Sequence, residues 1–179
     1  MYFTQWNPKI YLHSNGKKKR EEWLLNNTPH RENGPAITDW NENGIIIYER
    51  WYNKGYTCRI SGPAITSWYK NGQKQKEQWQ FYNKLHRIDG PAYTSWYKNG
   101  QKKYEKWCLD DIINRNDAPS LTRWYSTSQK KSEEWFINGK LHRNDGPAYI
   151  SWYSNGRRQC EKWVRNGNLQ KKFTWANIK

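Results

Sequence analysis

Residues 90–107 read GPAYTSWYKNGQKKYEKW, and this stretch decides the fold of the chain. Residues 91–98 are rich in Tyr, Thr and Trp and alternate as a half-buried β-strand does. Asn99-Gly100 follows, a pair that favours the two positive φ angles of a type I′ turn. Residues 101–107 alternate again. The stretch therefore predicts a β-hairpin with a two-residue loop.

The two-residue loop determines which side chains face each other across the hairpin. It places Thr94 opposite Glu105 and Trp96 opposite Lys103, because antiparallel partners point to the same face. One face is then expected to carry Ala92, Thr94, Trp96, Lys103, Glu105 and Trp107. The other face is expected to carry Tyr93, Ser95, Tyr97, Lys102, Tyr104 and Lys106.

The same hairpin recurs every 28 residues. Gly-Pro-Ala turns begin at Gly34, Gly62, Gly90 and Gly146, and Ala118-Pro119 fills the missing position. A second turn signal, Asn138-Gly139, indicates a short connection between units. A fixed period of this length predicts stacked units that contact mainly their neighbours. The expected fold is all-β, an elongated single sheet of about six stacked antiparallel hairpins.

Tryptophan follows the repeat in two columns, which hold 11 of the 13 Trp residues. The first column contains Trp40, Trp68, Trp96, Trp124 and Trp152. The second column contains Trp23, Trp51, Trp79, Trp107, Trp135 and Trp163. We expect these rings to supply a thin core that is renewed in every unit.

The composition indicates a folded but very polar chain. The 179 residues include 31 Lys and Arg against 16 Asp and Glu, a net charge of +15, and 17% of residues are aromatic. Disordered chains are poor in aromatic residues. No run approaches the roughly 18 apolar residues of a membrane span, and no signal-peptide pattern opens the chain. We expect a soluble protein without a large globular core.

Both ends depart from the repeat. Residues 1–10 are expected to form an N-terminal cap, and residues 11–169 a continuous array with a degenerate copy near residues 110–128. Residues 170–179 are expected to form a C-terminal cap or a dimerisation segment.

A glutamate stands two residues before each Trp of the second column: Glu21, Glu49, Glu77, Glu105, Glu133 and Glu161. A row of carboxylates suggests either cation binding and acid–base chemistry or a hydrogen-bonding role in the scaffold. Catalytic carboxylate pairs act at one place and in different environments. Six equivalent positions therefore favour the scaffold role.

Histidine occupies a single slot of the repeat, at His30, His86 and His142, and Arg follows each time. Ligands spaced along an array do not converge on one metal ion. We expect the Arg to pair with the Asp of the Asp-Gly-Pro turn, at Asp89 and Asp145.

Cysteine supplies no recognisable motif, because the three thiols fall in three different slots. This usage predicts a reducing, intracellular compartment. We expect no catalytic residue, no metal, no cofactor and no small-molecule substrate. An enzymatic site in the degenerate copy, at Asp110, Asp111 and Asp117, is the weakest of the three functional hypotheses.

The stretch WFINGKLHRNDGPA, from Trp135 to Ala148, resembles a variant MORN repeat (membrane occupation and recognition nexus). It is similar to the longer-period repeats of large DNA viruses that infect amoebae, such as marseilleviruses and mimiviruses, and of bacterial antitoxin-like proteins. The usual MORN unit is shorter and has a Tyr-x-Gly-x-Trp core, where this chain reads Tyr104-Glu105-Lys106-Trp107. The resemblance implies a hairpin array without enzymatic activity, used for scaffolding, self-association or membrane contact. A viral origin implies a virion-associated protein, located in the host cytoplasm or the virion.

The leading functional hypothesis is a non-enzymatic scaffold that binds a protein partner or itself. A hairpin array ends in open strand edges, which can pair with another chain. We therefore expect a homodimer formed through the ends of the array.

The alternative hypothesis uses the excess of positive charge. Basic residues follow turns in successive copies and are expected to align as a stripe along one edge: Lys18, Lys102, Lys103, Lys130, Lys131, Arg157 and Arg158. Interleaved with Tyr and Trp, such a stripe suits the phosphates of a nucleic acid or an anionic membrane surface. The same residues also keep a sheet soluble.

Overall fold

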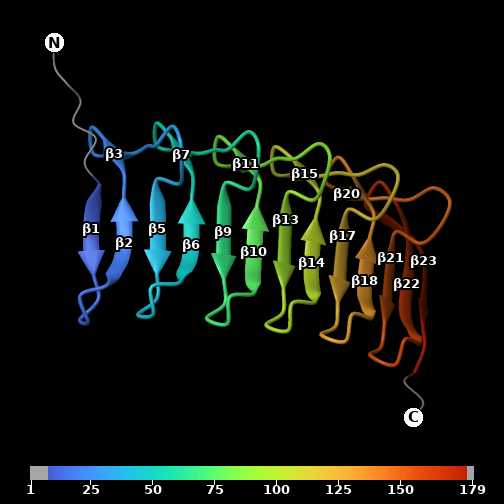
Figure 1. Ribbon diagram of the computed structural model, residues 1–179. Coiled ribbons are helices and arrows are strands. Elements are labelled where there is room, and N and C mark those ends of the chain that lie inside the picture. The colour runs from blue at the N-terminus through green and yellow to red at the C-terminus, as the bar shows by residue number, and fades with distance from the viewer. Residues whose placement is uncertain (1–7, 177–179) are drawn as a thin grey trace. The chain divides into compact units, whose positions relative to one another are not determined.

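The structure, a computed structural model, describes residues 8–176. These residues form strands and turns and contain no helix. No helix long and apolar enough to cross a membrane is therefore found among them. Thirteen strands follow chain order in one antiparallel sheet of consecutive hairpins, and short two-stranded hairpins connect them (Figure 1). The predicted all-β hairpin sheet is confirmed. The chain divides into two compact units, Met1–Leu85 and His86–Lys179.

The first unit contributes six strands to the main sheet and three small hairpins. The main strands are β1 (Lys9–Leu12), β2 (Lys18–Glu22), β5 (Ile37–Trp40), β6 (Ile46–Arg50), β9 (Ile65–Trp68) and β10 (Lys74–Gln78). The small hairpins are β3 (Leu24–Leu25) with β4 (Thr28–Pro29), β7 (Tyr52–Asn53) with β8 (Tyr56–Thr57), and β11 (Gln80–Phe81) with β12 (Lys84–Leu85).

The second unit contributes seven strands and two small hairpins. Its main strands are β13 (Tyr93–Trp96), β14 (Lys102–Lys106), β17 (Leu121–Trp124), β18 (Lys130–Glu134), β21 (Tyr149–Trp152), β22 (Arg158–Arg165) and β23 (Asn168–Thr174). The small hairpins are β15 (Cys108–Leu109) with β16 (Ile112–Ile113), and β19 (Phe136–Ile137) with β20 (Lys140–Leu141).

Each main hairpin closes through three residues instead of the expected two. The Tyr97 N–H donates to the Gln101 carbonyl at 2.8 Å, and the Gly100 N–H donates to the Tyr97 carbonyl at 2.9 Å. Within Asn99-Gly100 only the glycine has a positive φ, +83°. This is a type I turn followed by a left-handed residue, which inserts a bulge into the strand that follows.

The bulge changes the side-chain faces near the turn. Thr94 pairs with Glu105, as predicted, but the register then shifts and Trp96 pairs with Lys102. The expected pair of Trp96 with Lys103 is therefore wrong. Because side chains alternate along a strand, the one-residue shift exchanges the faces of Lys102 and Lys103. The same shift occurs in all six main hairpins of residues 8–176.

Turns with two positive φ angles lie elsewhere, in the small hairpins and between β22 and β23. They occupy Asn26-Asn27, Lys54-Gly55, Tyr82-Asn83, Asp110-Asp111, Asn138-Gly139 and Asn166-Gly167. Two consecutive positive φ angles are the mark of a type I′ turn, which suits a two-residue loop.

Small side chains fill the most buried positions. Ala36, Ala64, Ala92 and Ala148, from the Gly-Pro-Ala turns, are fully buried. Ser120 takes this position in the degenerate copy, and its hydroxyl bonds both the N–H and the carbonyl of Phe136 at 3.0 Å. All eleven column Trp rings are half-buried. The core is thin because each ring also forms part of the surface.

The ends of the array belong partly to the sheet. Lys9 and Ile10, within the expected N-terminal cap, lie in β1, and residues 170–174 of the expected C-terminal cap lie in β23. Residues 1–7 and 177–179 of the two caps lie outside the described residues.

Candidate binding surfaces

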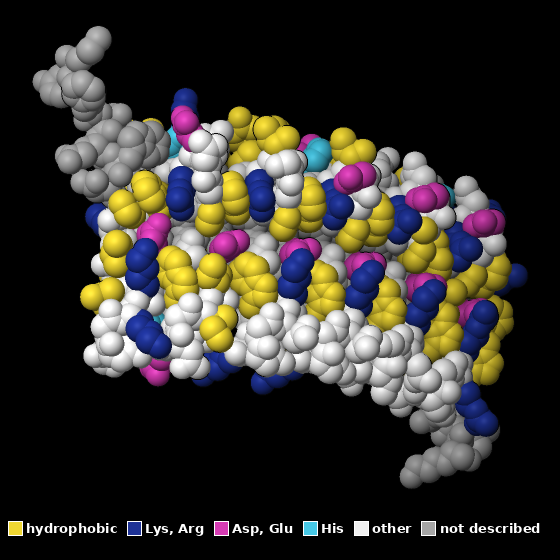
Figure 2. All heavy atoms as spheres, viewed as in Figure 1, with side chains coloured by type: hydrophobic (Ala, Val, Ile, Leu, Met, Phe, Trp, Pro, Cys, Tyr) yellow, Lys and Arg dark blue, Asp and Glu magenta, His cyan; other side chains and the backbone are white. Residues whose placement is uncertain are grey.

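One face of the sheet, called the Trp face, carries both Trp columns and the Glu column. In five of the six main hairpins of residues 8–176, a cation three residues before the column Glu pairs with it. The pairs are Lys18 with Glu21, Lys74 with Glu77, Lys102 with Glu105, Lys130 with Glu133, and Arg158 with Glu161. Figure 2 shows the resulting rows, in which basic and hydrophobic side chains alternate beside acidic ones.

The surroundings of the column carboxylates set their pKa values. Burial raises the pKa of Glu21, but hydrogen bonds from Lys18 and from the Trp23 indole N–H, 2.6 Å away, outweigh it and leave the pKa below its usual value. Ile46 replaces the cation in the second hairpin. Burial there raises the pKa of Glu49, and Arg59 offsets only part of the effect. The repeated pairing indicates a structural role for the column.

The arginine after each histidine slot lies over a Trp of the second column. The guanidinium carbon stands 3.8–4.3 Å from the ring centroid in Arg31–Trp23, Arg59–Trp51, Arg115–Trp107 and Arg143–Trp135. The glycine of Gly-Pro-Ala lies against the same group, since a Cβ on Gly146 would come within 2.9 Å of the Arg143 guanidinium carbon. Close packing therefore explains the glycine.

The expected pairing of this arginine with the turn aspartate is confirmed. The Nε–Oδ1 distance is 2.9 Å in Arg87–Asp89, 3.0 Å in Arg115–Asp117 and 3.1 Å in Arg143–Asp145. These hydrogen bonds lower the pKa values of Asp89, Asp117 and Asp145.

The histidine slot joins one copy to the next. His30 Nδ1 accepts the Lys54 N–H at 3.1 Å, and His142 Nδ1 accepts the Asn166 N–H at 3.0 Å. Asn114 fills the same slot and accepts through its amide oxygen at 3.2 Å from the Asn138 nitrogen. In these three copies the slot supplies a hydrogen-bond acceptor, whereas His86 Nδ1 contacts the Asp110 carboxylate at 3.0 Å. Sequence reasoning missed this role, because the partner lies 24 residues away.

The basic residues expected to form one stripe divide between the two faces. Lys18, Lys102, Lys130 and Arg158 pair with the Glu column on the Trp face. Lys103 and Lys131 instead lie over the rings of Tyr97 and Tyr125, 5.5 and 5.4 Å from their centroids. Arg157 lies at the turn, where its N–H donates to Asn155 Oδ1 at 3.1 Å. The single stripe is therefore wrong, because each bulge turns neighbouring lysines to opposite faces.

An exposed aromatic cluster lies on the small hairpins of the first unit. Tyr56 begins β8, Phe81 ends β11, and Tyr82 is the first residue of the turn that follows β11. Their side chains are 49%, 44% and 51% exposed. The Tyr82 ring centroid is 5.5 Å from that of Tyr56 and 4.6 Å from that of Phe81. Tyr82 has a φ of +47°, a conformation that a bulky side chain rarely adopts.

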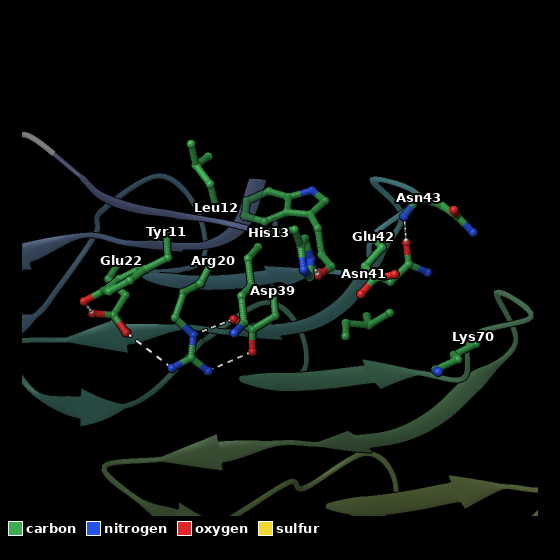
Figure 3. Close-up of a pocket in the computed structure, with 13 residues that line it drawn as sticks. Tyr11, Leu12, His13, Arg20, Glu22, Asp39, Asn41, Glu42, Asn43 and Lys70 are labelled. Carbon is green, nitrogen blue, oxygen red and sulfur yellow. Dashed lines mark hydrogen bonds and ion pairs between the residues drawn. The ribbon is translucent and has the colours of Figure 1, made fainter. Parts of the chain in front are cut away.

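A hollow of about 900 Å³ lies beside strands β1, β2 and β5. Arg20 occupies it, with its Nε 2.5 Å from Asp39 Oδ1 and an Nη1 3.4 Å from Glu22 Oε1 (Figure 3). The hydrogen bonds that Arg20 donates to Asp39 raise the pKa of Arg20 above its usual value. One guanidinium faces two carboxylates here, so the trio carries a net charge of −1 and does not favour an anionic ligand.

Potential metal ligands do not gather in residues 8–176, where no group of three or more His, Cys, Asp or Glu side chains has a suitable arrangement. Cys58, Cys108 and Cys160 are free thiols. Burial raises the pKa of Cys108, which keeps that thiol protonated and weakly nucleophilic.

Comparison with known proteins adds no assignment to these surfaces. No model of a known protein family matches the chain, and no curated protein shows significant similarity to it.

Proposed function

We propose that the protein is a non-enzymatic scaffold whose first unit binds a partner protein. The observation that carries this proposal is the exposed cluster of Tyr56, Phe81 and Tyr82. Tyrosine and phenylalanine are enriched at protein interfaces, where they supply large contact areas. Tyr82 is the aromatic residue at a turn position that Asn, Asp or Lys holds in the other small hairpins, and its side chain is 51% exposed.

The surroundings of the cluster indicate the chemistry of the partner. Lys84 pairs with Phe81 across the small hairpin, and Lys54 lies in the turn beside Tyr56, both exposed. A partner surface with an apolar centre and an acidic rim matches this arrangement. The MORN-like assignment, which rests on residues 135–148, agrees with a scaffold and remains a prediction.

Self-association through the sheet edges is part of the same proposal. Among the described residues, β1 pairs only with β2, and β23 pairs only with β22. Unpaired strand edges are templates for β-pairing between chains. A homodimeric mass by light scattering at micromolar concentration is expected, and a monomeric mass throughout would contradict this part.

The partner-binding part is tested by affinity recovery from the native source with three versions of the protein. The wild type is expected to retain a partner that the double variant Tyr56→Ser/Tyr82→Asn loses. The control Ile112→Ser changes an exposed apolar residue at the matching small-hairpin position of the second unit and should retain it. Because Asn suits a positive φ, the double variant should fold at least as well as the wild type. Equal recovery by all three versions would refute the docking role of the cluster.

A further inference from the structure

The second unit presents a sheet face rich in tyrosine and lysine, opposite the Trp face. Strand register links Ser95, Tyr104, Arg123, Ser132, Ser151 and Cys160 in one row across β13 to β22. The next row contains Tyr93, Lys106, Leu121, Glu134, Tyr149 and Lys162. Directly opposed residues point to the same side. We call this surface the Tyr face.

A hollow of about 330 Å³ opens on this face over β13, β14 and β17. Its walls include Tyr93, Tyr97, Tyr104, Lys103, Arg123 and Lys131. The rings of Tyr93 and Tyr104 have centroids 5.6 Å apart, and the Arg123 guanidinium carbon is 5.1 Å from the Tyr104 centroid. Aromatic rings and cations are therefore in direct contact here.

A second hollow of about 330 Å³ lies on the same face over β21, β22 and β23. Tyr149, Tyr153, Lys162 and Lys172 line it, with the Lys162 nitrogen 5.0 Å from the Tyr149 centroid. Four strand spacings separate β14 from β22, which is about 19 Å. One extended ligand of a few nucleotides is long enough to reach both hollows.

Charge on the Tyr face is strongly positive. The strand side chains of the second unit that lie on this face include six cations: Lys103, Lys106, Arg123, Lys131, Lys162 and Lys172. Among these described strand residues the single carboxylate is Glu134, and it pairs with Arg123. The first unit differs, because the hollow beside β1, β2 and β5 holds Arg20 between the carboxylates of Asp39 and Glu22.

We propose that the Tyr face of the second unit binds single-stranded nucleic acid, with phosphates on its lysines and bases stacked on its tyrosines. A positive groove interleaved with aromatic rings is the arrangement used by proteins that bind single strands without sequence preference. Duplex DNA keeps its base faces stacked inside, so the tyrosines would contribute nothing to its binding. A flat anionic membrane would not reach rings that line hollows, whereas membrane binding needs apolar groups that insert.

The test measures fluorescence anisotropy of a labelled oligothymidylate of about 16 nucleotides, titrated with the full chain at several salt concentrations. The wild type is expected to bind at low salt and to lose affinity linearly with the logarithm of salt concentration. The double variant Lys103→Gln/Lys131→Gln should reduce this slope by about 1.4, since each single-strand phosphate contact contributes about 0.7. Tyr93→Leu should weaken binding about tenfold with the slope unchanged.

The matched control is Lys102→Gln/Lys130→Gln, which removes the same charge from the adjacent positions on the Trp face. Its salt slope is expected to equal that of the wild type. Equal losses in the two double variants would overturn the site, as would a lack of binding at low salt. Equal affinity for a duplex of the same phosphate content would refute the stacking of bases on the tyrosines. Binding to phosphatidylserine vesicles without binding to the oligonucleotide would replace the proposal with a membrane role. These variants leave the cluster of the first unit intact, so the outcome is independent of the scaffold test.

Discussion

The guanidinium carbon of Arg143 lies 4.2 Å from the centroid of the Trp135 ring. The same side chain donates to Asp145, and its guanidinium occupies the space that a Cβ on Gly146 would need. One arginine thus joins the Trp column, the turn carboxylate and the glycine of Gly-Pro-Ala. These residues recur together because they share one contact, although the fourth copy keeps the Arg115 contacts with Ala118 in place of the glycine.

We predict that Arg143→Ala lowers the free energy of unfolding by about 1 kcal/mol, through loss of the cation–π contact. Gly146→Ala should cost less than about 1 kcal/mol, since the fourth copy retains the Arg115–Trp107 contact beside Ala118. Urea denaturation of both single variants and the double variant measures the coupling. When Arg143 is already alanine, Gly146→Ala should no longer lower the free energy of unfolding. If it lowers that free energy as much as in the wild type, the backbone conformation of Gly146 and not the contact with Arg143 is the cause.

Ile46→Lys should stabilise the protein by up to about 1 kcal/mol at neutral pH, because it supplies the cation that Glu49 lacks. The raised pKa of Glu49 means that its favourable contribution is present at low pH and is lost as pH rises through that pKa. A new lysine acts against this loss, so the gain should disappear at acidic pH, once the Glu49 carboxyl is protonated. Thermal unfolding across this pH range measures it. A gain independent of pH would show that the lysine acts without Glu49.

Ser128→Gly should raise the free energy of unfolding by about 0.5–1 kcal/mol. Ser128 has a φ of +70° at the turn position that glycine holds in the other main hairpins, and a left-handed conformation is costly for residues with a Cβ. The hydrogen bond from Ser128 to Gln101 is lost, which limits the gain. Thr127→Gly is the control: Thr127 lacks a positive φ, so glycine there should destabilise. Chemical denaturation compares the two, and equal effects would refute the role of backbone strain.

His142→Leu should lower the free energy of unfolding by about 1 kcal/mol, because the Asn166 N–H loses its acceptor. His142→Asn should cost much less, since Asn114 serves the Asn138 N–H in the neighbouring copy. Hydrogen exchange of the Asn166 amide gives a local measurement, and fast exchange is expected in the leucine variant alone. Equal protection in both variants would mean that the turn does not depend on this bond.

Much of the fold could be predicted from the sequence because it is local and repeated. Alternating segments flanked by turn residues define strands whatever lies beyond them, and the 28-residue period shows which elements stack. The pairing of Thr94 with Glu105 and the contact of Arg143 with Asp145 followed from the same pattern. The exposure of Phe81 and Tyr82 did not, because an aromatic residue beside a turn can pack inward or outward.

The loop of the main hairpin shows where local information ends. Asn-Gly suits both a two-residue type I′ loop and a three-residue loop that ends in a left-handed glycine. In the structure the Asn99 side-chain amide donates to the Ser126 carbonyl of the next copy at 2.9 Å, an interaction 27 residues distant in sequence. Such a contact exists only once the copies are stacked, and it accompanies the three-residue loop.

The sequence by itself determined the repeat, the strands, the positions of the turns and the positive charge of this protein. Only the tertiary structure decided which lysines face which way: Lys102 meets Glu105 on the Trp face, whereas Lys103 lies over Tyr97 on the other. The physical reason is the period of two along a strand, which makes a single bulged residue reverse the face of every neighbour beyond it. That reversal adds Lys103 and Lys131 to the tyrosine and lysine surface proposed to bind single strands.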